Sequence, residues 1–127
     1  MQNEIWKDIP GFPGYQVSNA GRVRSLPRTV KRGNHTMNIS GSILRFGTSM
    51  GYPFVNLRKD GKSISVKVHK LVGLVFVKNP QNRPEIDHIN TDRKDNRPEN
   101  LRWVNRHENN MNPITRTRMS IVKRTIK

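Results

Sequence analysis

Asp87 and His88 are adjacent in the chain, and several asparagines follow them. Hydrolysis of a phosphodiester needs a base that activates water, charge stabilisation on the phosphoryl oxygens and help for the leaving alkoxide. An imidazole can act as the base, and a hard divalent cation supplies the other two while using only one or two protein carboxylates. Asp87, His88 and Asn109 therefore offer a carboxylate, an imidazole and an amide oxygen that suit metal-assisted cleavage of a phosphodiester.

Two short strands around a polar loop are expected to position the Asp-His pair. Residues 85–89 and 101–104 are predicted strands, and residues 90–100 form the loop between them. In an ideal strand His88 points to the opposite face from Asp87, so a twist or bulge would be needed for both to serve one site.

A helix is expected after the second strand. Asn105, with Glu108 three residues later, is typical of a capping box at the start of a helix. Asn109 would lie about one helical turn beyond the cap, which favours it as the helix ligand. Asn110 and Asn112 compete with it for that role.

The charge is unevenly distributed. The chain has 24 basic and 9 acidic residues, a formal net charge of +15, which implies a polyanionic partner. Residues 1–84 carry 14 basic and 3 acidic residues, residues 85–112 carry 5 and 6, and residues 113–127 carry 5 and none. The acidic segment would either bind a cation or pair with its own basic side chains, namely Arg93, Lys94, Arg97, Arg102 and Arg106.

Composition limits the remaining possibilities. The chain has 127 residues, 32% of them hydrophobic, which predicts a thin core and one compact domain or two small modules. It has no cysteine, so neither a disulfide framework nor a cysteine-ligated zinc is expected. No apolar run approaches the roughly 18 residues of a membrane span, and the first residues do not resemble a signal peptide. We expect an intracellular, cytoplasmic protein.

Strands are expected before the Asp-His pair. Tyr15, Val17 and Val23 alternate with polar residues on either side of residues 18–21, a Ser-Asn-Ala-Gly turn, which predicts a short hairpin. Residues 27–42 are predicted to be a basic loop because they contain several turn-forming residues.

A second hairpin and a helix follow. Residues 52–58 and 62–68 flank Asp60-Gly61, a strong hairpin signal. The apolar period then becomes that of a helix, ended by Asn79-Pro80. The apolar face of this helix consists of Val68, Leu71, Val72, Val75 and Phe76.

These segments resemble the HNH endonucleases of the phage and intron-homing type. The resemblance rests on His69–Phe76, on Asp87-His88-Ile-Asn, on residues 96–104 and on Glu108-Asn109. Residues 6–26 are similar to the NUMOD4-like module that often precedes such nucleases.

The resemblance implies an α+β fold in three parts. Residues 1–45 would be a small NUMOD4-like β-hairpin module, and residues 113–127 a basic tail. Residues 46–112 would be the HNH nuclease domain, whose ββα-metal (His-Me finger) core lies at about residues 85–112.

Residue roles also follow from the resemblance. His88 would be the general base, and Asp87 and Asn109 the ligands of a single Mg²⁺ or Mn²⁺, without a structural zinc. Asn100 would constrain the loop and orient His88, although it could simply cap a turn. His69 would either fix its helix against the hairpin by a hydrogen bond or lie near the metal site.

The implied substrate is double-stranded DNA, cut to leave 5′-phosphate and 3′-hydroxyl ends. One such site makes one cut, so a monomer should nick, and only a homodimer, or sequential action, would break both strands. The alternatives are a non-catalytic DNA-binding protein with a vestigial HNH site and, less favoured, an RNA-binding protein; no membrane partner is expected. The DNA-binding candidates are Arg22, Arg24, Arg28, Lys31, Arg32, Arg93, Arg102, Arg116 and Arg118.

Overall fold

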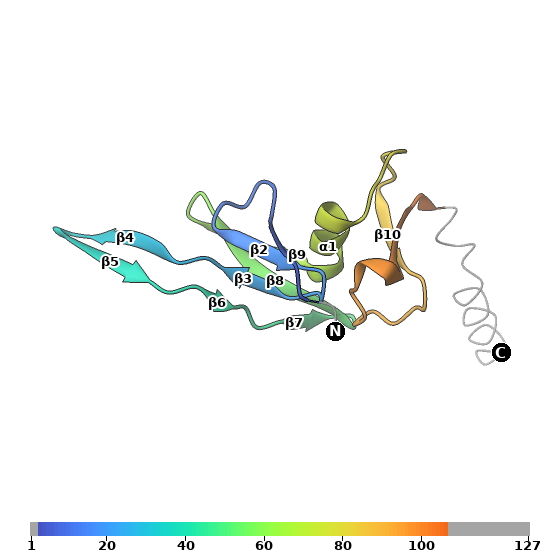
Figure 1. The fold of residues 1–127 in the computed structure, drawn as a ribbon, viewed down its shortest axis with the longest axis horizontal. Coiled ribbons are helices and arrows are strands. Elements are labelled where there is room, and N and C mark those ends of the chain that lie inside the picture. The colour runs from blue at the N-terminus through green and yellow to red at the C-terminus, as the bar shows by residue number, and fades with distance from the viewer. Residues whose placement is uncertain (1–2, 107–127) are drawn as a thin grey trace.

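The computed structural model describes residues 3–106, which form an α+β fold of eleven strands, one α-helix and one 3₁₀ helix (Figure 1). The strands are β1 (Trp6–Asp8), β2 (Tyr15–Ser18), β3 (Val23–Ser25), β4 (Arg28–Arg32), β5 (His35–Ile39), β6 (Ser42–Ile43), β7 (Gly47–Ser49), β8 (Tyr52–Lys59), β9 (Lys62–Lys67), β10 (Glu85–His88) and β11 (Leu101–Val104). Helix α1 spans Val68–Phe76, and the 3₁₀ helix spans Pro98–Asn100 within the predicted polar loop.

The first sheet has the strand order β1-β2-β3-β6 and contains the predicted N-terminal hairpin. Strands β2 and β3 pair antiparallel, and Val17 lies directly opposite Val23. Both valines are fully buried, so this hairpin provides one side of the hydrophobic core. The flanking strands β1 and β6 were not expected from the sequence.

The prediction of a loop at residues 27–42 is wrong, because this segment contains the two-stranded ribbon of β4 and β5. Its two-residue turn is Gly33-Asn34, and Gly33 has a φ of 61°, a conformation that glycine adopts without steric cost. Four of the five residues in each strand are exposed, so the ribbon lacks the one-sided apolar alternation that marks a packed strand.

The hairpin around Asp60-Gly61 is confirmed as β8 and β9, which form a sheet with β7. Asp60 and Gly61 have φ values of 52° and 76°, as a tight hairpin turn requires. The predicted helix is confirmed as α1, which ends at Phe76, before the expected stop at Asn79-Pro80. The central core residues are Ile9, Val17, Val23, Val55, Leu57, Val68, Leu71, Val72 and Leu101, which form one cluster.

Strands β10 and β11 are the expected pair around the polar loop, and α1 lies against them. Gly73 permits this approach, since a Cβ there would lie 2.2 Å from Cδ1 of Ile86. The indole Nε1 of Trp103 donates to the carbonyls of Gly73 and Val77 at 3.3 and 3.1 Å. The α1 backbone therefore fixes the strand pair that carries Asp87. The helix predicted after Asn105 lies outside the described residues.

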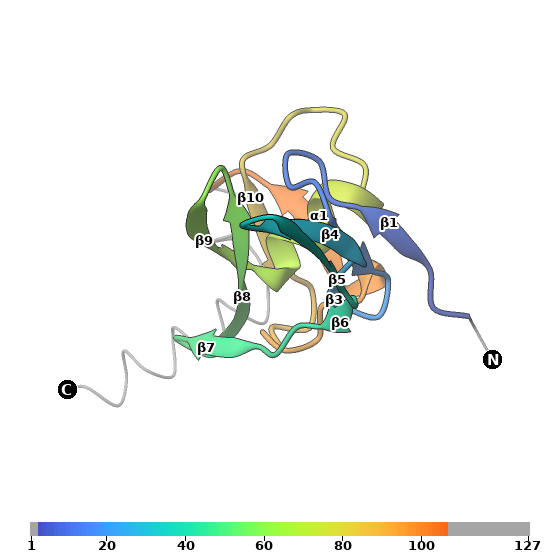
Figure 2. The same ribbon diagram turned by 90° about the vertical axis from the view of Figure 1, so that its left-hand side faces the viewer.

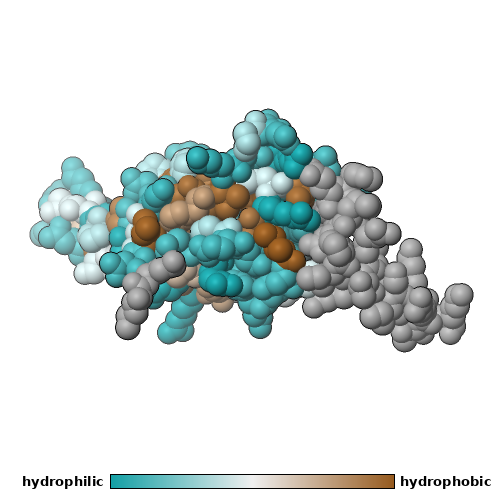
Figure 3. Space-filling model, turned by 45° about the vertical axis from the view of Figure 1, so that its right-hand side comes forward, coloured by the Kyte–Doolittle hydropathy of each residue, from teal (hydrophilic) through white to brown (hydrophobic). Residues whose placement is uncertain are grey.

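The described structure is elongated. Figure 1 shows the β4–β5 ribbon at one end and β10 at the other, with α1 closer to β10. Figure 2, viewed from the ribbon end, shows the ribbon in front of the remaining elements. The face in Figure 3 is largely hydrophilic around central apolar areas. No helix in residues 3–106 has the length and apolar character needed to span a membrane.

Candidate active site

The last two residues of β10 carry the candidate chemistry. Asp87 and His88 are 6% and 5% exposed, although they are a carboxylate and an imidazole. They stand directly opposite Arg102 and Leu101 of β11 in a regular antiparallel register. Buried polar groups of this kind are stable only when they have partners, and the two side chains contact different ones.

His88 is held by Asn96, a residue to which sequence analysis assigned no role. The distance from His88 Nε2 to Asn96 Oδ1 is 2.7 Å, and Asn96 is only 5% exposed. An amide oxygen can only accept, so Nε2 carries the proton and donates it to this hydrogen bond. An imidazole that carries its proton on Nε2 has its lone pair on Nδ1, which makes Nδ1 the atom able to accept a proton. The sequence signal was a second asparagine inside the segment that resembles the HNH motif.

Asn100, the predicted orienting residue, holds the loop that follows His88. Its Oδ1 accepts from the backbone N–H of Asn90 at 3.0 Å, and its Nδ2 donates to Asn90 Oδ1 and to the Asp95 carbonyl, both at 2.9 Å. Its carbonyl accepts from Ile89 N–H at 2.8 Å. Asn100 is 6% exposed, so these bonds connect a buried side chain at the end of the loop to its start and its middle. This arrangement suits the predicted restraint of the loop.

An exposed ion pair between two residues of the same loop, Arg97 and Asp95, also stabilises it. The Arg97 guanidinium donates to both carboxylate oxygens of Asp95, at 2.8 and 2.9 Å. This bidentate pair, together with a hydrogen bond from Asn90, lowers the pKa of Asp95 to about 2. Asp95 is therefore ionised at neutral pH and available to organise the loop.

Asp87 is paired with Arg102 across the strand pair. Arg102 donates from Nε and an Nη atom to Asp87 Oδ2 at 3.1 and 3.0 Å. The buried carboxylate suits a hard divalent cation, since Mg²⁺ uses one or two carboxylates alongside water. Residues 3–106 contain no group of three or more histidine, aspartate or glutamate side chains placed to hold a metal. The other predicted ligand, Asn109, lies outside the described residues.

His69 lies beside His88. The two ring centroids are 5.0 Å apart in an edge-on arrangement, and His69 is 6% exposed. Its Nδ1 is buried without a hydrogen-bond partner among the described residues, so this atom does not make the hydrogen bond considered above. Burial, and to a lesser extent the nearby basic groups of His88, Lys67 and Lys70, lowers the pKa of His69 to about 3. His69 is therefore neutral at physiological pH.

The first two DNA-binding candidates lie on the N-terminal sheet. Arg22 forms a bidentate ion pair with Glu4, whose pKa is lowered to about 2, mainly by this hydrogen bond. Arg24 donates to Gln16 Oε1 at 3.0 and 2.6 Å. Both guanidinium groups also lie over the Trp6 ring, at 5.6 and 4.2 Å from its centroid. The two positive charges therefore lie close together over the Trp6 side chain.

The other candidates are dispersed. Arg28, Lys31 and Arg32 are exposed on the ribbon, at the opposite end of the molecule from β10 (Figure 1). Arg93 lies in the loop after His88, and Arg102 is occupied by Asp87 as described above. Two further candidates, Arg116 and Arg118, lie outside the described residues. The candidates that lie within residues 3–106 therefore do not form one patch.

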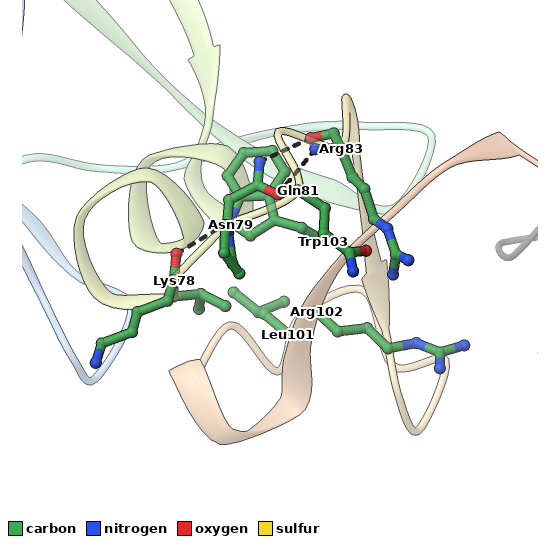
Figure 4. Close-up of a pocket in the computed structure, with 9 residues that line it drawn as sticks. Lys78, Asn79, Gln81, Arg83, Leu101, Arg102 and Trp103 are labelled. Carbon is green, nitrogen blue, oxygen red and sulfur yellow. Dashed lines mark hydrogen bonds between the residues drawn. The ribbon is translucent and has the colours of Figure 1, made fainter.

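A shallow pocket of about 230 Å³ lies beside the site, and its lining includes Arg102 and Trp103 (Figure 4). The segment between α1 and β10 closes on itself there, because the Asn79 side chain both donates to and accepts from the Arg83 backbone at 2.8 Å. Asp87 and His88 do not line this pocket. These two hydrogen bonds fix the conformation of residues 79–83, which lead into β10.

The chain is similar to known proteins over most of its length. Residues 4–58 match the NUMOD4 motif, and residues 78–111 match the HNH endonuclease family. An HNH endonuclease of Acanthamoeba polyphaga mimivirus is 38% identical over 130 residues, which cover 98% of this chain and 30% of that protein. DNA endonuclease I-HmuI of Bacillus phage SP01 is 33% identical over 120 residues, which cover 93% of this chain and 62% of I-HmuI.

A solved structure supports the same relationship. The structure described as DNA binding and cleavage by the HNH homing endonuclease I-HmuI superposes with a TM-score of 0.67 and 32% identity, over 94% of this chain and 66% of that one. The chain spans less than two thirds of the length of each of these relatives. By its fold and these matches, the chain carries a NUMOD4 motif joined to an HNH endonuclease domain.

Proposed function

We propose that this chain is a metal-dependent DNA endonuclease that hydrolyses phosphodiester bonds to 5′-phosphate and 3′-hydroxyl ends. The observation that carries the proposal is His88, buried on β10 beside Asp87 with Nε2 engaged by Asn96 at 2.7 Å. A buried imidazole in one defined tautomer is what a general base requires. The HNH match over residues 78–111 includes all three side chains.

His88 is the proposed base. Its Nδ1 accepts a proton from the attacking water, and the resulting imidazolium keeps its Nε2–H donated to Asn96. Asn96 holds the ring and its tautomer throughout, while Asn100 restrains the backbone on both sides of the loop. The two asparagines thus divide the orienting role that sequence analysis gave to Asn100.

Asp87 and Asn109 are the proposed ligands of a single Mg²⁺ or Mn²⁺. The divalent cation, when bound, stabilises charge on the phosphoryl oxygens and on the leaving alkoxide. Asp87 supplies a buried carboxylate for the cation. When no cation is bound, the Arg102 guanidinium compensates the negative charge of Asp87, as a buried anion requires. The positive charge of Arg102 therefore lies next to the proposed metal ligand Asp87.

DNA recognition is proposed to extend along the length of the molecule. Residues 1–45 would act as the DNA-binding module, and residues 113–127 as a basic tail. This proposal is supported by the exposed basic ribbon β4–β5, which lies at the opposite end of the described structure from β10 (Figure 1). The ribbon and the β10 site could contact the same duplex only if the protein lay along the duplex axis. One site per chain predicts that a monomer nicks, and that double-strand cleavage needs a homodimer or sequential cuts.

Plasmid cleavage in Mg²⁺, in Mn²⁺ and in EDTA tests this proposal. We expect nicked product in either metal and none in EDTA, and ligation should reseal the nick, because a 5′-phosphate and a 3′-hydroxyl are the ends that ligase joins. Cleavage that persists in EDTA would refute metal dependence. A plasmid that is bound but uncut in all three conditions, including one that carries the chain's own coding locus, would favour the vestigial alternative.

A further inference from the structure

Tyr52 contacts the candidate base from outside the HNH-matched segment. It is the first residue of β8, directly after the two-residue turn Met50-Gly51, whose φ values are 52° and 82°. These positive φ values characterise a tight hairpin turn that fixes the direction of the strand it begins. Tyr52 is half-buried, and its position is set by this turn.

Three rings meet at this point. The Tyr52 centroid lies 5.1 Å from that of His69 and 5.9 Å from that of His88, and the two histidine centroids are 5.0 Å apart. All three separations fall within the range of packed aromatic pairs, about 4.5–7 Å. The His88 ring therefore touches two rings that come from β8 and α1, neither of which belongs to its own strand pair.

Two cations hold Tyr52 in place. Lys67 Nζ lies 4.9 Å and the Arg93 guanidinium 4.7 Å from the ring centroid. Arg93 also donates to the carbonyl of Met50, so the loop after His88 is attached to the turn before Tyr52. The Met50-Gly51 turn and the loop after His88 are thereby connected through the Tyr52 ring and Arg93.

These contacts supply what the Asn96 hydrogen bond cannot. A single hydrogen bond at Nε2 fixes one end of the His88 ring but leaves the ring plane free to rotate about it, whereas ring packing restricts that plane. Proton transfer depends on alignment, and a displacement of about 1 Å can lower a rate by about a hundredfold.

We propose that Tyr52 is a positioning residue for His88, acting through its ring rather than its hydroxyl group. Tyr52 lies in the NUMOD4-matched segment and His88 in the HNH-matched segment, so the nuclease site is completed by a side chain from the other matched segment. The inference deepens the proposed function and rests on His88 being the base.

The test compares Tyr52→Phe, which keeps the ring, with Tyr52→Leu, which removes it. Tyr52→Phe should cut DNA within about twofold of the wild type, whereas Tyr52→Leu should lose about tenfold to a hundredfold in kcat with an unchanged Kd for DNA. The matched control is Tyr15→Leu at the only other tyrosine, which packs on the core and whose hydroxyl accepts from Arg58 N–H at 3.1 Å. The control should retain its kcat even where it lowers Tm as much.

Three outcomes of the cleavage assay would overturn the proposal. The first is wild-type kcat in Tyr52→Leu, and the second is equal losses of kcat in Tyr52→Leu and Tyr15→Leu. An equal loss in Tyr52→Phe and Tyr52→Leu would assign the effect to the hydroxyl group and would also overturn it. Tyr52→Met replaces Tyr52→Leu if the latter does not fold.

A second readout is independent of nuclease activity. In ¹H–¹⁵N spectra of the free protein, the His88 ring should show one Nε2–H tautomer in the wild type and in Tyr52→Phe, with shifted or exchange-broadened signals in Tyr52→Leu. Unchanged His88 signals in Tyr52→Leu would refute the positioning role. A wild type that never cuts DNA would refute the proposed function but leave this measurement valid.

Discussion

Asn96→Ala should impair both stability and catalysis, because it removes the acceptor of a buried donor. His88 Nε2 and Asn96 Oδ1 are 2.7 Å apart, and both residues are about 95% buried, so water cannot readily replace the lost oxygen. A buried donor left unsatisfied costs about 1–3 kcal/mol. Each kcal/mol corresponds to roughly 4–8 °C in Tm for a domain of 60–100 residues.

The catalytic effect of Asn96→Ala should exceed its effect on DNA affinity. Without the acceptor at Nε2, the His88 ring samples the other tautomer and other orientations, and we expect kcat to fall by about tenfold to a hundredfold. Asn96→Asp retains an acceptor oxygen and should lose less. Asn56→Ala is the matched control, since Asn56 is exposed and its Oδ1 accepts from Ser65 at 2.6 Å. Thermal unfolding and single-turnover cleavage are the assays; unchanged Tm and kcat in Asn96→Ala would refute the orienting role.

Three further predictions concern pH, packing and salt. The pKa of His69 is about 3 in the folded protein and about 6.5 in the unfolded chain, so between these pH values the unfolded state binds more protons. The free energy of unfolding should therefore fall as the pH drops below 6.5, by up to about 1.4 kcal/mol per pH unit from this group. Urea titrations of His69→Phe should lack this pH-dependent component. Gly73→Ala should lower the free energy of unfolding by about 1–3 kcal/mol through contact of the new Cβ with Ile86, offset in part by the gain in helix propensity of about 1 kcal/mol; a rise in stability by urea denaturation would contradict this. Replacing Arg28, Lys31 and Arg32 together by Gln should reduce the slope of log K against log salt by up to about 2.7 in anisotropy titrations, because each phosphate contact contributes about 0.9, whereas Lys62→Gln at the other hairpin should leave it unchanged.

Local patterns predicted the elements that border the core. The β8–β9 hairpin and α1 follow from an Asp-Gly turn and a change of apolar period, both of which are properties of adjacent residues. The β4–β5 ribbon was missed because it is exposed on both faces and has little apolar alternation to detect. Its Gly33-Asn34 turn was the remaining signal.

The site was only partly accessible from the sequence. Asp87 and His88 were predicted from their types and from the surrounding motif, but which asparagine reaches the His88 ring depends on how the loop folds. That loop turns so that Asn96 meets Nε2, while Asn100 spans its base. Tyr52 is far from His88 in the chain, and the packing of α1 against both β8 and the β10–β11 pair, together with the Arg93–Met50 hydrogen bond, brings them together.

The most direct test of His88 as the general base is to measure single-turnover cleavage and DNA affinity of the wild type and His88→Ala in Mg²⁺. General-base catalysis contributes about 10²–10⁴ in rate. We therefore predict that His88→Ala loses cleavage by a factor in this range while its Kd for DNA stays unchanged. Cleavage by His88→Ala at the wild-type rate would contradict the assignment of His88 as the base, and with it the central claim about this site.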